Sequence, residues 1–213
     1  MANWDGLADT LLAGYRRGIF PMAEGRDDPD LHWVEPKLRG VLPLDGFHIS
    51  RSLGKTIRRG DYRVTVNSAF ARVVAACADR EETWINAPLT RLYAALHARG
   101  HAQSLEVWQG DRLAGGVFGV SFGRTFCGET MFSRMRDGSK VALVYLVDRL
   151  RRSGFVLFDT QFLTPHLASL GGVEIPQATY LELLAHAREG QADFGAGAVP
   201  SPQELMQRMT QTS

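Results

Sequence analysis

The stretch from residue 104 to residue 132 constrains the fold most, because it consists of three consecutive extended segments. SLEVW, LAGGVFGVSFG and RTFCGETMF are rich in Val, Phe and Thr, and glycine-containing turns at 110–111 and 123–124 separate them. Runs of β-branched and aromatic residues between such short turns are typical of neighbouring antiparallel strands. The sequence therefore predicts a three-strand antiparallel meander.

Helical patterns surround this meander. An apolar stripe from Trp4 to Tyr15 at helical spacing predicts a helix over about residues 4–16. The remaining elements are predicted from helix-capping residues and from the alternation of apolar and polar residues in strands. They are helices beginning after Ser50, Asn67 and Asn86, at Ser139 and at a Thr179–Glu182 capping box, and strands near residues 31–34, 40–43, 62–66 and 155–162.

The chain of 213 residues has the size of one domain with a small additional unit. We expect a small N-terminal domain over residues 1–44, a main domain over 45–190 and a loosely ordered, Gly- and Pro-containing tail over 191–213. The predicted order of elements is that of acetyltransferase-like folds: a strand, two helices, the meander, a central helix, a strand and a final helix. The predicted class is α+β, with a central and mostly antiparallel sheet.

Composition excludes several classes of protein. With 24 basic and 23 acidic residues the net charge is +1, which excludes a globally basic nucleic-acid binder. No apolar run approaches the 18 residues that span a bilayer, and the N-terminus lacks a signal-peptide pattern. Cys77 and Cys127 have no partner spacing, so neither a disulfide nor a cysteine zinc site is predicted. We expect a cytoplasmic protein.

One local patch is strongly basic. Arg51, Lys55, Arg58 and Arg59 share the outer face of a predicted helix, and residues 51–63 carry five basic side chains against one acidic. A charged helix face often only contacts solvent. Here no acidic residue at helical spacing relieves the charge, which favours an anionic partner such as phosphate groups.

Three polar residues stand in apolar surroundings. Asp159 and Gln161 lie two apart on a predicted interior strand, so their side chains share one face. Burying them costs a few kcal/mol unless they are hydrogen-bonded. They either satisfy each other or line a site, and Glu129, placed among apolar residues of the meander, favours a site.

The context of two generic motifs argues against the functions that they indicate elsewhere. The segment GVSFG at 119–123 matches a serine-hydrolase nucleophile elbow, with Asp159 and His166 in the required order. That elbow needs a strand-to-helix turn, whereas another strand follows here. His97 and His101 are four apart, but Gly100 ends the helix between them, so no metal site is predicted.

Longer phrases go beyond generic motifs: YRRGIFP at 15–21, HISRS at 48–52, YRVTVN at 62–67, TWI at 83–85, SLEVW at 104–108, FCGETMFSRM at 126–135 and DTQFLTPHLASLGG at 159–172. With these phrases, the chain resembles the bacterial leucyl/phenylalanyl-tRNA–protein transferases over about residues 5–188. The resemblance implies a small N-terminal domain followed by an acetyltransferase-like (GNAT-type) domain. The implied activity is transfer of Leu or Phe, and weakly Met, from tRNA to proteins that begin with Arg or Lys, which marks them for N-end-rule degradation.

The resemblance also implies roles for individual residues. Asp159 and Gln161 match the catalytic pair, and Glu129 matches the acidic residue beside the aminoacyl group. Tyr15 and Trp84 would lie near the terminal adenosine, whereas Met22 replaces a Trp that is common in the family. The implied aminoacyl pocket consists of six apolar residues: Val117, Phe126, Met131, Leu143, Leu146 and Phe158.

The expected chemistry is aminolysis of an already activated ester, so neither metal, ATP nor another cofactor is expected. We expect the Gln161 amide to donate to Asp159 and to direct its carbonyl at the attacking amine, while Glu129 helps to position a cationic group. Alternatively, the terminal ribose hydroxyls assist proton transfer and these residues only orient. The expected partners are Leu-tRNA, Phe-tRNA and proteins with N-terminal Arg or Lys, bound by a monomer.

Two rival functions remain as alternatives. An acyl-CoA N-acetyltransferase would need an R/Q-x-x-G-x-G/A loop for pyrophosphate, whereas residues 133–140 contain one glycine and no such spacing. A non-enzymatic tRNA-binding module would explain the basic helix but would leave Asp159, Gln161 and Glu129 without a role.

Overall fold

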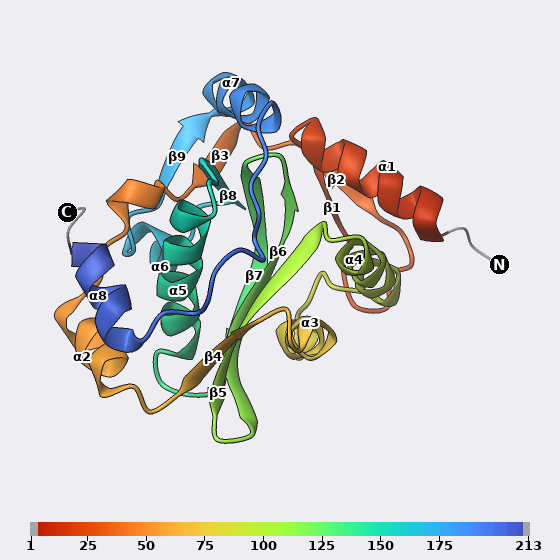
Figure 1. Ribbon diagram of the computed structural model, residues 1–213. Coiled ribbons are helices and arrows are strands. Elements are labelled where there is room, and N and C mark those ends of the chain that lie inside the picture. Colours follow the sequence, from red (N-terminus) through yellow and green to blue (C-terminus); the bar gives the residue numbers. More distant parts are fainter. Residues whose placement is uncertain (1–3, 211–213) are drawn as a thin grey trace.

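The computed structural model describes residues 4–210 and contains a seven-stranded sheet with helices on both faces (Figure 1). The strands, in spatial order, are β4 (Arg63–Val66), β5 (Ala102–Gln109), β6 (Arg112–Phe122), β7 (Thr125–Ser133), β8 (Leu157–Gln161), β3 (Leu38–Val41) and β9 (Val173–Pro176). Neighbouring strands are antiparallel except β7 and β8, which are parallel. The α+β class and the mostly antiparallel sheet are thereby confirmed.

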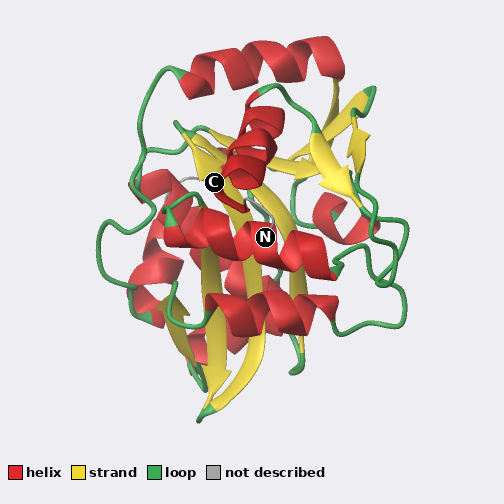
Figure 2. Ribbon diagram, turned by 90° about the vertical axis from the view of Figure 1, so that its right-hand side faces the viewer, coloured by secondary structure: helices red, strands yellow, loops and turns green. Residues whose placement is uncertain are grey.

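Each face of the sheet carries its own apolar core. The first core packs α1 (Trp4–Arg16), α3 (Phe70–Ala78), α4 (Ala87–Ala98) and α7 (Gln177–Arg188) on one face. Figure 2 looks onto the side of the molecule where α1, α3 and α4 lie. The second core, on the other face, contains α2 (Arg51–Arg59), α5 (Gly138–Arg152), α6 (Pro165–Ala168) and α8 (Pro202–Thr210). In the described part of the chain, no helix is long and apolar enough to cross a membrane.

The predicted meander is confirmed as β5, β6 and β7, and it contains one irregularity. Two-residue turns join the strands, with Gly110 and Gly123 at positive φ, a conformation that glycine adopts without steric cost. On β6 Phe118 faces Thr130 and Gly119 faces Gly128, so Glu129 is an extra residue on β7. Such a β-bulge re-aims a side chain and is common beside active sites.

Two of the predicted caps are confirmed and two are wrong. Ser50 accepts from the Leu53 amide, and Asn86 accepts from the Leu89 amide. Asn67 does not cap α3, because its side-chain oxygen accepts instead from the Ser104 amide on the adjacent strand. The Thr179–Glu182 capping box is wrong, since α7 begins at Gln177, directly after Pro176 ends β9.

The tail over 191–213, expected to be loosely ordered, contains a packed helix near its end. Residues 202–210 form α8, which buries Leu205, Met206 and Met209 against α2 and α5. Before it, Phe194 stacks on Phe126 of β7, with 5.6 Å between ring centroids. These apolar residues give the segment a face for the second core despite its Gly and Pro content. Residues 211–213 lie outside the described residues.

The N-terminal segment is also joined to the main sheet more closely than expected. Phe20–Met22 (β1) and His32–Val34 (β2) form a separate two-stranded sheet, and Leu44–Gly46 is a short 3₁₀ helix. Strand β3, however, lies inside the expected 1–44 unit and pairs with β8 and β9 of the main sheet.

Candidate active site

The three predicted polar residues meet where β7 and β8 stop pairing. The parallel pairs run from Thr125 and Leu157 to Cys127 and Asp159. Glu129 and Gln161 each lie two residues further along their strands, and the Gln161 Nε2 donates to Glu129 Oε1 at 2.9 Å. All three side chains are buried. The structure thus brings together residues that the sequence separates.

Glu129 lies in a cage of three donors. Besides Gln161, the Tyr15 hydroxyl donates to Oε1 at 2.7 Å and the Tyr93 hydroxyl to Oε2 at 2.6 Å. Burial raises the pKa of Glu129 to about 7, although the hydrogen bonds from Tyr93, Tyr15 and Gln161 act in the opposite direction. Glu129 can therefore gain or lose a proton near neutral pH.

Asp159 has its hydrogen-bonding capacity filled. Arg39 donates to Oδ1 through Nε at 2.8 Å and to Oδ2 through Nη2 at 2.6 Å. The backbone N–H of Gln161 donates to Oδ1 and the Tyr180 hydroxyl to Oδ2, both at 2.8 Å. Four donors on two oxygens use the positions that a carboxylate offers. Asp159 is thus an anchored anion, with no oxygen available for a substrate proton.

The expected bond from the Gln161 side chain to Asp159 is wrong in detail. The main-chain N–H of Gln161 makes that bond, and its side chain turns to Glu129 instead. Gln161 has a φ of 65°, which is uncommon for a residue other than glycine and is often found at functional sites. Asp159 therefore acts on the conformation of the backbone that presents Gln161.

Sequence reasoning missed Arg39, which is 1% exposed. Its guanidinium lies 4.7 Å from the ring centroid of Phe20 and 4.4 Å from that of Tyr180, and it donates to the Gly18 carbonyl. Burial by itself lowers the pKa of Arg39, but the hydrogen bond and charge of Asp159 raise it above its ordinary value. The only signal in the sequence was the need of a buried Asp159 for a cationic partner.

Gly40, next to Arg39, allows the close approach of β3 to the end of β8. A Cβ added at Gly40 would lie 2.5 Å from the carbonyl carbon of Phe162. Gly40 pairs with Gln161 in the sheet, at a register shift. A side chain at Gly40 would therefore push β3, and with it Arg39, away from the Gln161 turn.

The six residues of the implied aminoacyl pocket lie together, on the other side of the sheet from Tyr15 and Tyr93. Five belong to the second core, and Met131 is partly buried against it: Val117, Phe126, Met131, Leu143, Leu146 and Phe158. A Cβ on Gly128 would lie 2.9 Å from the Phe158 ring, so the glycine lets this ring pack against β7. The polar residues and the apolar cluster meet at the divergence of β7 and β8. The pocket itself stays a prediction.

The residues expected near adenosine and tRNA are divided between the two faces. Tyr15, Met22 and Trp84 are in or against the first core, and Trp84 lies edge-on to Tyr93, with ring centroids 6.4 Å apart. The basic residues are exposed on α2, which belongs to the second core: Arg51, Lys55, Arg58 and Arg59. Of these, Arg59 forms an ion pair with Asp61. The structure does not bring this basic face to Glu129.

The hydrolase alternative is contradicted. Ser121 lies within β6, two residues before the hairpin to β7, so it does not begin a helix. Its hydroxyl accepts from Gln103 Nε2 at 3.1 Å. Within residues 4–210, no group of three or more His, Cys, Asp or Glu side chains is placed to hold a metal ion.

Comparison with known proteins identifies the family. A family model described as leucyl/phenylalanyl-tRNA protein transferase matches residues 41–185, and the model of that family's N-terminal domain matches residues 7–37. Among curated relatives, leucyl/phenylalanyl-tRNA–protein transferase of Cereibacter sphaeroides is 62% identical and covers 95% of each chain. The protein of the same name from Ruegeria is also 62% identical, over 97% of this chain and 98% of the relative.

Similarity to solved structures is weaker. The crystal structure of FemX aligns with a TM-score of 0.48 at 13% identity, over 73% of this chain and 60% of that chain. The two family-model matches together span most of the chain, and the relatives match it at nearly full length. The chain belongs to the leucyl/phenylalanyl-tRNA–protein transferase family and is an aminoacyltransferase.

Proposed function

We propose that this protein transfers Leu or Phe, and weakly Met, from its tRNA to the α-amine of proteins that begin with Arg or Lys. The product is a substrate for N-end-rule degradation. The enzyme acts as a cytoplasmic monomer without a cofactor, and its main domain has the GNAT-type fold. The element order and the single parallel strand pair, β7 with β8, support this fold.

The single observation that carries the proposal is the Gln161–Glu129 pair at the divergence of these strands. Gln161 Nε2 is engaged by Glu129, whereas no described residue donates to the Gln161 side-chain carbonyl. This carbonyl is free to accept an N–H of the attacking amine. The strained backbone at Gln161, held by Asp159 and Arg39, sets its direction.

In the proposed reaction, the neutral α-amine attacks the ester carbonyl carbon. The new C–N bond forms, the bond from this carbon to the ribose oxygen breaks, and the amine proton ends on the released ribose hydroxyl. Gln161 orients the amine, and the Glu129 carboxylate fixes the Gln161 amide and attracts a cationic acceptor. Whether the proton moves directly to the ribose oxygen or through Glu129 does not change this balance.

The aminoacyl side chain enters the apolar cluster between Met131, which lies beyond the last pair of β7 with β8, and Phe158, which precedes that pair by one residue. Met131 is partly buried and its unbranched side chain adapts readily, so it can make room for a ligand. The buried residues beneath it, Leu143 and Leu146 of α5, limit the depth.

The test is transfer of radiolabelled Leu from Leu-tRNA to a peptide that begins with Arg. A peptide that begins with Ala is the matched control, and acetyl-CoA is the competing donor. We expect label only on the Arg peptide and no acetylation. Acetylation, or no transfer to either peptide despite tRNA binding, would reject the proposal in favour of the two rival functions.

A further inference from the structure

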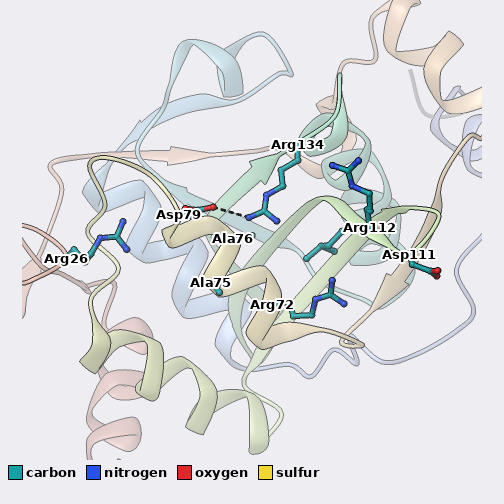
Figure 3. Close-up of a pocket in the computed structure, with 9 residues that line it drawn as sticks. Arg26, Arg72, Ala75, Ala76, Asp79, Asp111, Arg112 and Arg134 are labelled. Atoms are coloured by element: carbon teal, nitrogen blue, oxygen red, sulfur yellow. Dashed lines mark hydrogen bonds and ion pairs between the residues drawn. The ribbon is translucent and has the colours of Figure 1, made fainter.

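A concave site that Glu129 does not line lies between α3, the β5–β6 hairpin and the segment after β7 (Figure 3). It is a hollow of about 620 Å³. Its charged lining comprises four arginines and two aspartates: Arg26, Arg72, Asp79, Asp111, Arg112 and Arg134. The family match and the residues implied by it assign no role to this hollow.

The charges in the hollow are only partly neutralised. Arg134 pairs with Asp79 at 3.1 Å, as the dashed line in Figure 3 shows. Arg26 donates to two main-chain carbonyls at the end of α3, those of residues 78 and 80. Arg72 lies over the Trp108 ring at 4.9 Å. The main chain of Arg112 pairs with Gln109 in the β5–β6 hairpin, but its guanidinium forms no hydrogen bond or ion pair with any described residue. Two exposed guanidinium groups thus keep free donors over one hollow.

The hollow connects two regions that already have proposed roles. On one side, Trp108 also lies under Arg63 at 5.2 Å, and Arg63 begins β4, which follows the basic helix α2. On the other side is a hollow of about 250 Å³ that shares Asp79 and Arg134 and is lined by Met131. Basic side chains therefore continue from Arg63, at the start of β4, to the entrance of the apolar cluster.

We propose that this hollow binds backbone phosphates of the aminoacyl-tRNA strand that ends in the aminoacylated adenosine. This inference rests on the proposed function, and it places part of the donor on a named surface. The planar fork of arginine matches phosphate oxygens, and aromatic rings beside guanidinium groups are common in sites for single-stranded RNA. The acceptor protein suits the hollow poorly, because its first residue is Arg or Lys and would be repelled by the excess of arginines.

The test compares Arg112→Glu with Lys37→Glu. Both make the same charge change at exposed side chains, and Lys37 lies beside β3, on the β9 side of the sheet. Arg112→Glu should weaken tRNA binding roughly tenfold at low salt and reduce the slope of log K against log salt by about one. Lys37→Glu should do neither. Arg112→Gln is the second variant and should show a smaller loss in the same direction.

A donor without phosphate separates binding from chemistry. With 3′-O-leucyl adenosine, Arg112→Glu should keep the wild-type kcat/KM, because that donor has no phosphate for Arg112 to contact. An equal loss with this donor, a change only in the KM of the acceptor peptide, or tRNA binding equal to that of Lys37→Glu would overturn the inference. If wild-type protein transferred no Leu at all, the proposed function would fail. The comparison of tRNA binding by Arg112→Glu and Lys37→Glu would still decide whether the hollow binds tRNA.

Discussion

Arg39 and Asp159 form a bidentate ion pair, with N···O distances of 2.8 and 2.6 Å, in which both side chains are at most 1% exposed. The pair lies directly behind the Gln161 turn, because Asp159 also accepts the Gln161 main-chain N–H. We therefore propose that Asp159 positions Gln161, and that Gln161 and Glu129 are the groups that face substrate. Each of these assignments can be tested separately.

Removing Arg39 should destabilise the whole protein. Arg39→Ala leaves the Asp159 carboxylate buried without its cation, and such a change costs about 3–5 kcal/mol. Arg99→Ala breaks an exposed ion pair with Asp9 and should cost no more than about 1 kcal/mol. Urea unfolding of both variants measures the difference. Equal losses would show that the Arg39 pair does not support the fold.

Gln161→Ala should lower kcat roughly a hundredfold while leaving tRNA binding unchanged, because a misplaced amine loses its near-attack geometry. Asp159→Asn should lower both kcat and stability, since it weakens the bonds to Arg39 and to the backbone of the turn. Single-turnover transfer, combined with thermal unfolding, separates the two effects. Wild-type turnover in Gln161→Ala would remove this residue from the site.

Stability should depend on pH through Glu129. Its pKa is about 7 in the folded protein, above the usual 4.5, so the folded state keeps a proton that the unfolded state has released. The unfolding free energy should fall as pH rises from about 4.5 to 7, by roughly 3 kcal/mol in total, and should not recover above pH 7. Glu129→Gln should remove this fall. Measuring the unfolding free energy of the wild type and of Glu129→Gln at pH 5 and pH 8 tests this prediction. An identical fall in both proteins would contradict the assignment of the pH dependence to Glu129.

Amino-acid selectivity should reside in the apolar cluster. Leu and Phe are unbranched at Cβ, whereas Val and Ile would press a methyl group against the mouth near Met131 and Phe158. One methyl group is worth only ~1–3 kcal/mol, or roughly 10–200-fold, and Met should be a weak donor. Comparing kcat/KM for one tRNA body charged with each amino acid tests this. If Val-tRNA had the same kcat/KM as Leu-tRNA, the nucleic acid and not the apolar cluster would determine selectivity.

Charge reversal on α2 should act on all tRNAs alike. Arg51 and Lys55 are exposed on its outer face, so replacing both by Glu should weaken binding of different tRNAs similarly. The salt slope should fall by about one for each lost phosphate contact. Filter binding at several salt concentrations measures both. An unchanged slope would mean that this face contacts only solvent.

Local patterns determined much of the fold. The meander followed from strand-forming residues between glycine turns, and α1 and α4 followed from apolar stripes and, for α4, the Asn86 cap. These features depend on residues a few positions apart, so the sequence was enough to predict them. The same reasoning failed at Asn67, whose oxygen bonds the Ser104 amide, 37 residues away. A cap predicted from near neighbours is lost when an adjacent strand supplies a better-placed donor.

The site depended on tertiary structure to a greater extent. The sequence indicated that Glu129, Asp159 and Gln161 were polar residues in apolar surroundings, because period-two alternation made them conspicuous. It did not indicate Arg39, 120 residues before Asp159, nor that the tyrosines at 15 and 93 donate to Glu129 and the tyrosine at 180 to Asp159. Nor did it indicate that a bulge turns Glu129 toward them. Sequence alone shows that a buried charge needs partners, but only the packing of distant elements decides which partners lie within hydrogen-bonding distance.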